Sequence, residues 1–582
     1  MPRQTGAYRL LTKLFLRQFL ENDLVSPDSD RAQLLAIVGA SVISLTLFIS
    51  MFMSAGYAMS RLAPSEGAVL TLSDKFFYIS LAMLVTALVA ASQWDALSID
   101  LRDAAILQPL PIRPVTLRLA KLTAVALLGA GVAIAVNLFP TIVFPWMLAF
   151  AVRQMSAFDV FRMIGIHAVI TITSAVFGYL VIIAIRESAS ALLGPTLFAR
   201  ASPWMQTTTI LLLGSTVLLL PIASTQVGQR GLTDWRLQLP STAFVGVYEE
   251  MTREFLADLP PGRLSPRQRE REIRFSEIYA QRRPLFAPLA QRAGMWLASV
   301  TAIVAIATLL NAFRTPSLSV SAPRRRRRSR LAGLPRLLFP RSHAARAGFD
   351  FALATVWRNK THRLTLACAA AVGLASVLVS LSRVNLGDDA VLTTRLLIIQ
   401  PLLYGALLVG FRHLVRVPAE LRANWAIQIA WRGQARAFAT GTEVAAMLTL
   451  VVPALLIVMP PVVMVAGLSI ALAHALIGLV GGALVLDTLM LSYDKVPFTC
   501  TYVPDDSVKG IAPLFVLAFL IGASLFARVE LAMLTGRAGV KAAIALAGLL
   551  VALRLISIMR ARSAHIDFNE GPDGFHQLGL HN

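Results

Sequence analysis

The sequence predicts an all-α protein that crosses a membrane about twelve times. Of its 582 residues, 56% are hydrophobic and only 15% are charged, whereas soluble domains carry about 25% charged residues. The hydrophobic residues gather in runs, and one helical span needs roughly 20 predominantly apolar residues. Residues 364–381, for example, contain no charged side chain. The composition therefore excludes an ordinary soluble domain.

The first 32 residues predict a cytoplasmic amphipathic helix rather than a cleavable signal peptide. Arg9, Lys13 and Arg17 recur at helical spacing and interrupt the apolar core that a signal peptide requires. The apolar residues that would form the opposite face are Leu10, Leu11, Leu14, Phe15 and Leu20. Such a helix suits the inner membrane face, and a helix that faces solvent is the alternative.

Twelve apolar runs follow. They cover approximately residues 33–58, 76–94, 122–150, 163–185, 206–226, 294–313, 364–382, 395–411, 443–467, 469–491, 510–527 and 539–558. The third is too long for one straight span, so we expect Pro140 and Pro145 to kink it or to end it early. The predicted organisation is a first six-helix half, 33–313, a basic cytoplasmic linker, 314–363, a second six-helix half, 364–558, and a cytoplasmic tail, 559–582.

Lysine and arginine accumulate in the connections that lie inside when both ends of the chain are cytoplasmic, as the positive-inside rule requires. The densest run, PRRRRRSR at 323–330, lies in the linker. Arginine blocks pair with nucleic-acid phosphates, but this placement favours fixing the topology and attracting anionic lipid. We therefore expect membrane lipid and no nucleic acid as its partner. Residues 227–293 then form a large external segment, in which 267–283 predict a solvated helix.

The connections after the second span of each half are similar to one another. Residues 420–443, ELRANWAIQIAWRGQARAFATGTE, follow residues 100–121, DLRDAAILQPLPIRPVTLRLAK, by 320 residues. At this offset the matched pairs are Asp100 and Glu420, Leu101 and Leu421, Arg102 and Arg422, Gln108 and Gln428, and Pro140 and Pro460. A shared offset without gaps predicts a duplication. Because each half has an even number of spans, the prediction is a parallel 6+6 repeat.

Few polar residues within the spans indicate chemistry. His167 and His474 stand alone in predicted spans, where packing or an interhelical hydrogen bond is the expected role and a proton relay is the alternative. Glu249 and Glu250 fall in the external segment and are expected to be solvated or to line a gate, since a general acid/base pair would need a partnered pocket. Gly481–Gly482 is expected to permit close helix packing.

Four patches carry a resemblance to a known family. They are DLRDAAILQPLPIRPVTLRLAK (100–121), LPSTAFVGVYE (239–249), VPAELRANW (417–425) and PFTCTYVP (497–504). Together they resemble ABC transporter permeases of the type-2 exporter class, in a bacterial form with two permease halves fused in one chain. The resemblance extends over essentially the whole chain. Ala243 stands where the family pattern has tryptophan and Asp505–Asp506 where it has Gly-Lys, and the resemblance names no substrate.

The resemblance implies a multi-pass protein of the bacterial plasma (inner) membrane whose two connections, 100–121 and 420–443, couple it to an ATPase. In such exporters the segment between spans two and three is a cytoplasmic helix that docks on the ATPase subunit and transmits its movement. A plain positive-inside loop is the alternative. The implied docking residues in this chain are Asp100, Leu101, Arg102, Asp103, Leu110, Pro111, Arg113, Glu420, Leu421, Arg422, Asn424 and Trp425.

The energy source is expected outside the chain. The sequence has no GxxxxGK[ST] phosphate-binding loop, so we expect a transport subunit with no enzymatic activity and no cofactor of its own. ATP and Mg²⁺ are expected on ATP-binding cassette ATPase subunits, two of them, one below each half. An ion-coupled secondary transporter is one alternative, but it usually needs acids or histidines deep in the bundle. A membrane scaffold or embedded enzyme is the other, and the sequence shows no convergent catalytic or metal-ligand set for an enzyme.

Overall fold

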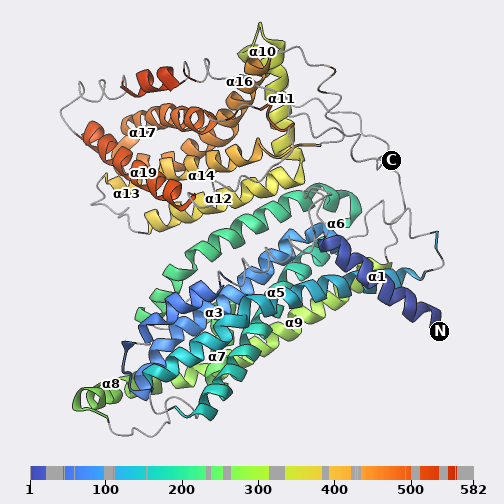
Figure 1. Ribbon diagram of the computed structural model, residues 1–582, viewed down its shortest axis with the longest axis vertical. Coiled ribbons are helices and arrows are strands. Elements are labelled where there is room, and N and C mark those ends of the chain that lie inside the picture. The colour runs from blue at the N-terminus through green and yellow to red at the C-terminus, as the bar shows by residue number, and fades with distance from the viewer. Residues whose placement is uncertain are drawn as a thin grey trace, which may run out of the picture. The chain divides into compact units, whose positions relative to one another are not determined.

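The computed structural model is built almost entirely from helices (Figure 1). It describes residues 2–20, 44, 46–57, 59–97, 109–110, 112–152, 155–230, 237–252, 264–313, 334–382, 392–420, 427, 429, 434–491, 493, 495–499, 512–535, 548–556 and 559. Within these residues there is no β-strand, which confirms the all-α prediction for this part of the chain.

The chain divides into two compact units. The first contains Met1–Thr209 and Thr216–Ser319, and the second contains Ile210–Ser215 and Val320–Asn582. The main boundary, at Ser319 and Val320, falls within the segment that the sequence predicts as a linker between two halves.

The first unit is a bundle of long helices with several shorter ones. Its elements are α1 (Pro2–Leu20), a helix at Thr46–Tyr57, α3 (Pro64–Ser92), η1 (Trp94–Leu97), α5 (Pro114–Ala151), α6 (Ala157–Arg230), α7 (Pro240–Met251), α8 (Pro266–Arg282), η3 (Arg283–Leu285) and α9 (Phe286–Phe313). Its core is rich in aromatic side chains, including Phe76, Tyr78, Phe144, Phe177, Phe244 and Tyr248. Local sequence fixes helix starts: Pro64 is the first residue of α3, and Glu66 accepts a hydrogen bond from Ala63 N–H.

The second unit contains α10 (Leu334–Leu338), α11 (His343–Arg358), α12 (Lys360–Leu381), α13 (Thr394–Leu397), α14 (Ile399–Leu414), α16 (Ala435–Ala446), a π-helical turn η6 (Met447–Val451), α17 (Val452–Met490) and α19 (Ala512–Thr535). Residues 548–556 are also helical. Its core includes Phe349, Leu396, Tyr404, Phe411, Val451 and Phe498.

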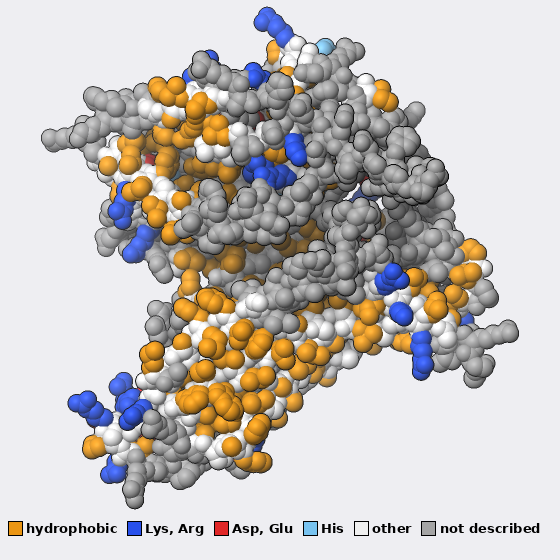
Figure 2. Space-filling view, viewed as in Figure 1, with side chains coloured by type: hydrophobic (Ala, Val, Ile, Leu, Met, Phe, Trp, Pro, Cys, Tyr) orange, Lys and Arg blue, Asp and Glu red, His pale blue; other side chains and the backbone are white. Residues whose placement is uncertain are grey.

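Eight helices among the described residues are long and apolar enough to cross a membrane. They contain ten of the twelve predicted apolar runs, because α6 holds two runs and the continuous stretch Ala435–Met490 holds two more. On the face shown in Figure 2, hydrophobic side chains cover the long helices of the first unit, and lysine and arginine side chains gather near its two ends. This distribution is typical of a protein that lies in a bilayer.

Several helices extend beyond the predicted spans. α3 begins at Pro64 and contains Lys75, which the sequence assigned to an outer connection. α19 continues to Thr535 and contains Glu530, beyond the predicted end at residue 527. Both charged side chains are buried beside a partner. A charge is tolerated inside a bundle when it is paired, so these two residues do not end their helices.

Two further differences concern predicted connections. α5 continues through Pro140 and Pro145 to Ala151, so it does not end early. Proline is tolerated in membrane helices because neighbouring groups satisfy the freed backbone atoms. The segment predicted as linker, 314–363, contains α11, whose Phe349 and Val356 are buried. The solvated helix predicted at 267–283 is present as α8, although its Tyr279 is buried.

Candidate functional site

Residues 100–108 and 111 of the first predicted docking segment lie outside the described residues. That part of the chain includes five of the predicted docking residues: Asp100, Leu101, Arg102, Asp103 and Pro111. Leu110 and Arg113 are described, and both are exposed. Arg113 caps the N-terminus of α5 with an extended backbone. The last part of the predicted segment, residues 114–121, therefore forms the first turns of a long apolar helix.

Helix α1 packs against the beginning of α5. Leu11 and Phe15 are almost fully buried against Leu117, Ala120 and Ala124. This packing fixes the first turns of α5, which contain the last residues of the predicted docking segment.

The same contact includes polar groups. The Lys121 ammonium lies 5.0 Å from the centre of the Phe15 ring, and the Tyr8 and Thr123 hydroxyls are 2.6 Å apart. Leu10 and Leu14 face away and are exposed. The helix predicted near the N-terminus is thus confirmed, with its apolar residues divided between α5 and an exposed side.

The second predicted docking segment begins among the described residues. Glu420 is exposed at its start. The other predicted docking residues of this segment lie outside the described part of the chain: Leu421, Arg422, Asn424 and Trp425. α16 begins shortly afterwards, at Ala435.

Hydrogen bonds hold the chain that leads to Glu420. The Phe498 N–H donates to the Val415 carbonyl at 2.9 Å, and the Ala419 N–H donates to the Phe498 carbonyl at 2.9 Å. The Tyr493 hydroxyl also donates to the Val415 carbonyl, at 2.7 Å. Two of the four family-like patches, which are far apart in the sequence, are therefore in direct contact.

The turn between α11 and α12 contributes two more contacts. Asn359 Nδ2 donates to the Ala419 carbonyl at 3.1 Å, and His362 Nε2 lies 3.0 Å from the Val417 carbonyl. Asn359 is also the N-cap of α12, where its side chain accepts hydrogen bonds from the Thr361 and His362 N–H groups. We call the group of Val415–Ala419, Phe498, Asn359 and His362 the docking clamp.

Phe498 has a backbone conformation that is rare for its residue type. Its φ of 64° is the one positive value at a non-glycine position among the described residues. A bulky residue in this region costs about 1–3 kcal/mol. The ring is fully buried against the rings of Phe351, His362 and Phe411. This packing and the two backbone hydrogen bonds stabilise the strained conformation.

A buried ion pair involves Glu249, the last residue of the family-like patch on α7. Lys75 Nζ is 2.5 Å from Glu249 Oε1, and the two side chains are 0% and 1% exposed. The Tyr279 hydroxyl donates to Glu249 Oε2 at 2.9 Å. Burial, with the nearby charge of Glu249, raises the pKa of Tyr248 well above its ordinary value, so this phenol stays neutral. The expectation that Glu249 is solvated is therefore wrong, because its cationic partner comes from a distant helix.

Both histidines predicted to stand alone make interhelical contacts. His167 Nδ1 lies 3.3 Å from the Tyr248 hydroxyl, and His474 Nδ1 lies 2.7 Å from Glu530 Oε1. Both imidazoles are buried. The expectation of interhelical hydrogen bonds is confirmed, but the carboxylate partner of His474 was missed, because Glu530 falls outside the predicted span.

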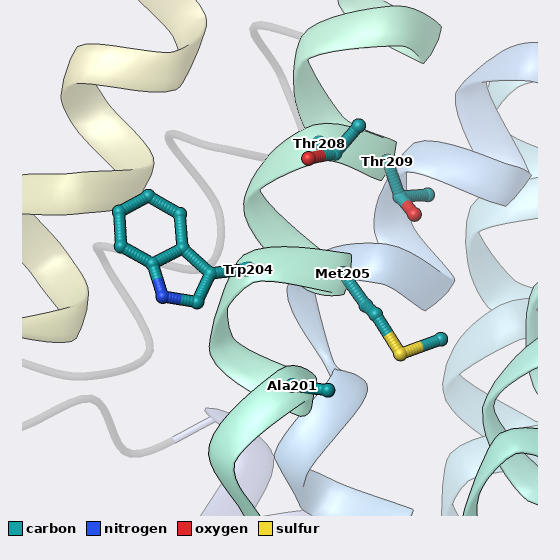
Figure 3. Close-up of a pocket in the computed structure, with 5 residues that line it drawn as sticks. All are labelled: Ala201, Trp204, Met205, Thr208 and Thr209. Carbon is teal, nitrogen blue, oxygen red and sulfur yellow. The ribbon is translucent and has the colours of Figure 1, made fainter. Parts of the chain in front are cut away.

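Other features do not point to a catalytic site. An open hollow of about 420 Å³ lies on α6 and is lined by Ala201, Trp204, Met205, Thr208 and Thr209, which Figure 3 labels. All of these residues come from one helix, and none is charged. In the part of the chain that the structure describes, no group of three His, Cys, Asp or Glu residues is placed to hold a metal ion.

Comparison of the chain with protein-family models, with curated proteins and with solved structures gave no match.

Proposed function

We propose that the chain is the membrane-spanning permease subunit of an ATP-driven exporter, coupled to separate ATPase subunits through residues 100–121 and 420–443. The docking clamp is the observation that carries this proposal. It fixes the stretch that leads to Glu420, the exposed first residue of the second predicted docking segment, to three parts of the second unit: the end of α14, the start of α12 and the turn at Phe498. A force applied to residues 420–434 would reach these helices directly, as coupling requires.

Twelve crossings agree with the helix lengths. The apolar part of α6, Ala157–Ser224, has 68 residues and would be about 100 Å long if straight, whereas a bilayer core is about 30 Å thick. Gly194, with φ 69° and ψ 170°, breaks this helix, and Gly467, with φ 82° and ψ 168°, breaks α17. Two crossings for each bring the eight long helices to ten crossings, and the other two predicted runs, 33–58 and 539–558, contain the shorter described helices at Thr46–Tyr57 and 548–556.

The two units also repeat one packing arrangement, which supports a duplicated permease. In the first, α1 packs on α5, which begins at Pro114. In the second, α11 packs on α16, which begins at Ala435. Each pair places an amphipathic helix against the helix that begins within a predicted docking segment. The two starting positions differ by 321 residues, close to the offset of 320 seen in the sequence.

Charge reversal in both docking segments tests the proposal. We expect the double variant Arg102→Glu, Arg422→Glu to lose its ATPase subunit on gentle purification from the native membrane, because each change places repulsion at a charged docking surface. Membrane insertion and yield should stay unchanged. The measurement is the amount of co-purified nucleotide-binding subunit, identified by mass spectrometry.

Arg336→Glu is the matched control, since this exposed arginine on α10 lies outside both segments. It should retain the ATPase. Equal association in the docking variant and the control would reject the coupling role. Failure to recover any nucleotide-binding subunit with the wild-type chain, together with transport that is insensitive to ATP depletion, would reject the exporter itself.

A further inference from the structure

We propose that His474 and Glu530 form a buried proton-binding site in the second unit. The two side chains join α17 to α19, with His474 Nδ1 2.7 Å from Glu530 Oε1. Each is 1% exposed. This site has no part in ATPase docking, and it stands whether or not the proposed function holds.

The site is built from a third helix as well. Gln400 of α14 is buried and donates from Nε2 to the main-chain carbonyl of His474 at 3.0 Å. Three polar atoms of the site are buried and make no hydrogen bond within the described part of the chain: Glu530 Oε2, His474 Nε2 and Gln400 Oε1. Unsatisfied buried polar atoms cost about 1–3 kcal/mol each. Three such atoms lie around one ionisable pair. This indicates a site that binds and releases a ligand rather than a contact that serves only the packing.

Small residues on α17 make room for this group. A Cβ at Gly478 would overlap Gln400 Nε2, and a Cβ at Gly481 would lie 2.8 Å from the Tyr404 hydroxyl. The close packing expected from the glycines of α17 is therefore present. The side chains that pack against Gly478 and Gly481 include the polar groups of Gln400 and Tyr404. Any larger side chain at Gly478 would displace the Gln400 amide from His474.

The charge of the pair depends on one proton. With Glu530 ionised and His474 neutral, the pair carries a net charge of −1; one further proton brings it to zero. A buried net charge is unfavourable unless it is compensated. Ionisable groups on the helices packed here are Arg395, Tyr404, Arg412, His413, Asp487 and Arg528.

None of these groups supplies a compensating positive charge inside the site. Arg395 and Arg528 are exposed. Arg412, His413 and Asp487 lie at least twelve residues along their helices from Gln400 or His474, about 18 Å at 1.5 Å per residue. Tyr404 carries no positive charge. A proton is therefore the charge that the closed site can take up.

A metal cation fits the same atoms poorly. Hard cations take about six oxygen ligands, whereas the free atoms here are two oxygens and one imidazole nitrogen. Two other buried groups serve as contrasts. Lys75 and Glu249 are already balanced as an ion pair, and His167 contacts the phenol of Tyr248.

Infrared spectroscopy of the purified full-length protein in lipid nanodiscs tests the site. The C=O band of protonated carboxyl groups is recorded while the pH is raised from mildly acidic to mildly alkaline. We expect Glu530→Gln, which keeps the shape and cannot titrate, to remove the signal of one titrating carboxyl per chain. His474→Gln should keep that signal but move its midpoint, because the carboxyl loses its basic partner. His167→Gln is the control and should leave the titration unchanged.

A wild-type titration that Glu530→Gln leaves unaltered would overturn the proposal. So would a signal whose midpoint moves when sodium replaces choline at fixed ionic strength, since this would assign the site to a metal cation. Equal elution profiles and equal membrane insertion of the variants exclude misfolding. If Glu530→Gln does not fold, an unchanged midpoint in His474→Gln overturns the proposal.

Discussion

Replacing Glu249 with alanine should lower the free energy of unfolding by about 3–5 kcal/mol, because it leaves the Lys75 ammonium buried without its counter-charge. Water does not reach the two side chains, whose exposures are 0% and 1%. The variant also removes the acceptor of the Tyr279 hydroxyl. The loss is measured as the change in unfolding free energy during denaturant titration of the protein in mixed micelles.

The double variant Lys75→Met, Glu249→Met separates charge from packing. Replacing both charges with apolar side chains of similar length is often neutral or stabilising, so it should recover most of the stability lost by Glu249→Ala. Arg271→Ala is the control, since Arg271 pairs with Glu66 but is 42% exposed, and such pairs contribute at most about 1 kcal/mol. If the single and double variants lose the same stability, an unbalanced charge at Lys75 is not the cause.

Gly441→Ala should destabilise the second unit by about 1–3 kcal/mol, the usual cost of overpacking a closely packed contact. A Cβ at Gly441 would overlap the carbonyl oxygen of Ala345, and a Cβ at Gly348 would overlap that of Phe438. Both obstacles are backbone atoms, which cannot rotate away as a side chain would. The two helices α11 and α16 must then separate. The thermal unfolding midpoint in detergent measures the effect.

Gly165→Ala is the matched control for this change. A Cβ at Gly165, inside α6, would meet no atom within 4 Å. Alanine is better than glycine in a helix by about 1 kcal/mol, so this variant should be neutral or more stable. The same substitution is thus expected to have opposite signs at the two positions. A loss of stability at Gly165 as large as that at Gly441 would show that the close contact between α11 and α16 is not the cause of the loss at Gly441.

The apolar runs predicted the helical class well, because a helix that crosses a bilayer carries its signal in its own residues. They failed where a charged residue is buried. Lys75 and Glu530 were placed in connections, since the predicted apolar runs stop short of both charged residues. Their partners, Glu249 and His474, lie 174 and 56 residues away. Pairing over such distances is decided by packing, and a local pattern contains no information about it.

The candidate site shows the same limit. The sequence suggested patches 417–425 and 497–504 separately, and the structure joins them through Phe498. The contribution of Asn359 and His362 to the docking clamp had no sequence signal beyond the capping preference of asparagine. The docking residues with the strongest sequence signal, such as Arg102 and Arg422, lie outside the described part of the chain. Their role therefore stays a prediction.

The conformation of Phe498 has a mechanical consequence. Its N–H and its carbonyl bond to Val415 and Ala419, on one short stretch of chain. When the first bond breaks, the backbone of Phe498 is free to leave the left-handed region, and that rotation carries the carbonyl away from Ala419. Strain of about 1–3 kcal/mol then favours completing the opening. We expect the two hydrogen bonds to break together. The stretch Val415–Ala419 should therefore change cooperatively between two states, bound to Phe498 or released from it, rather than deform gradually.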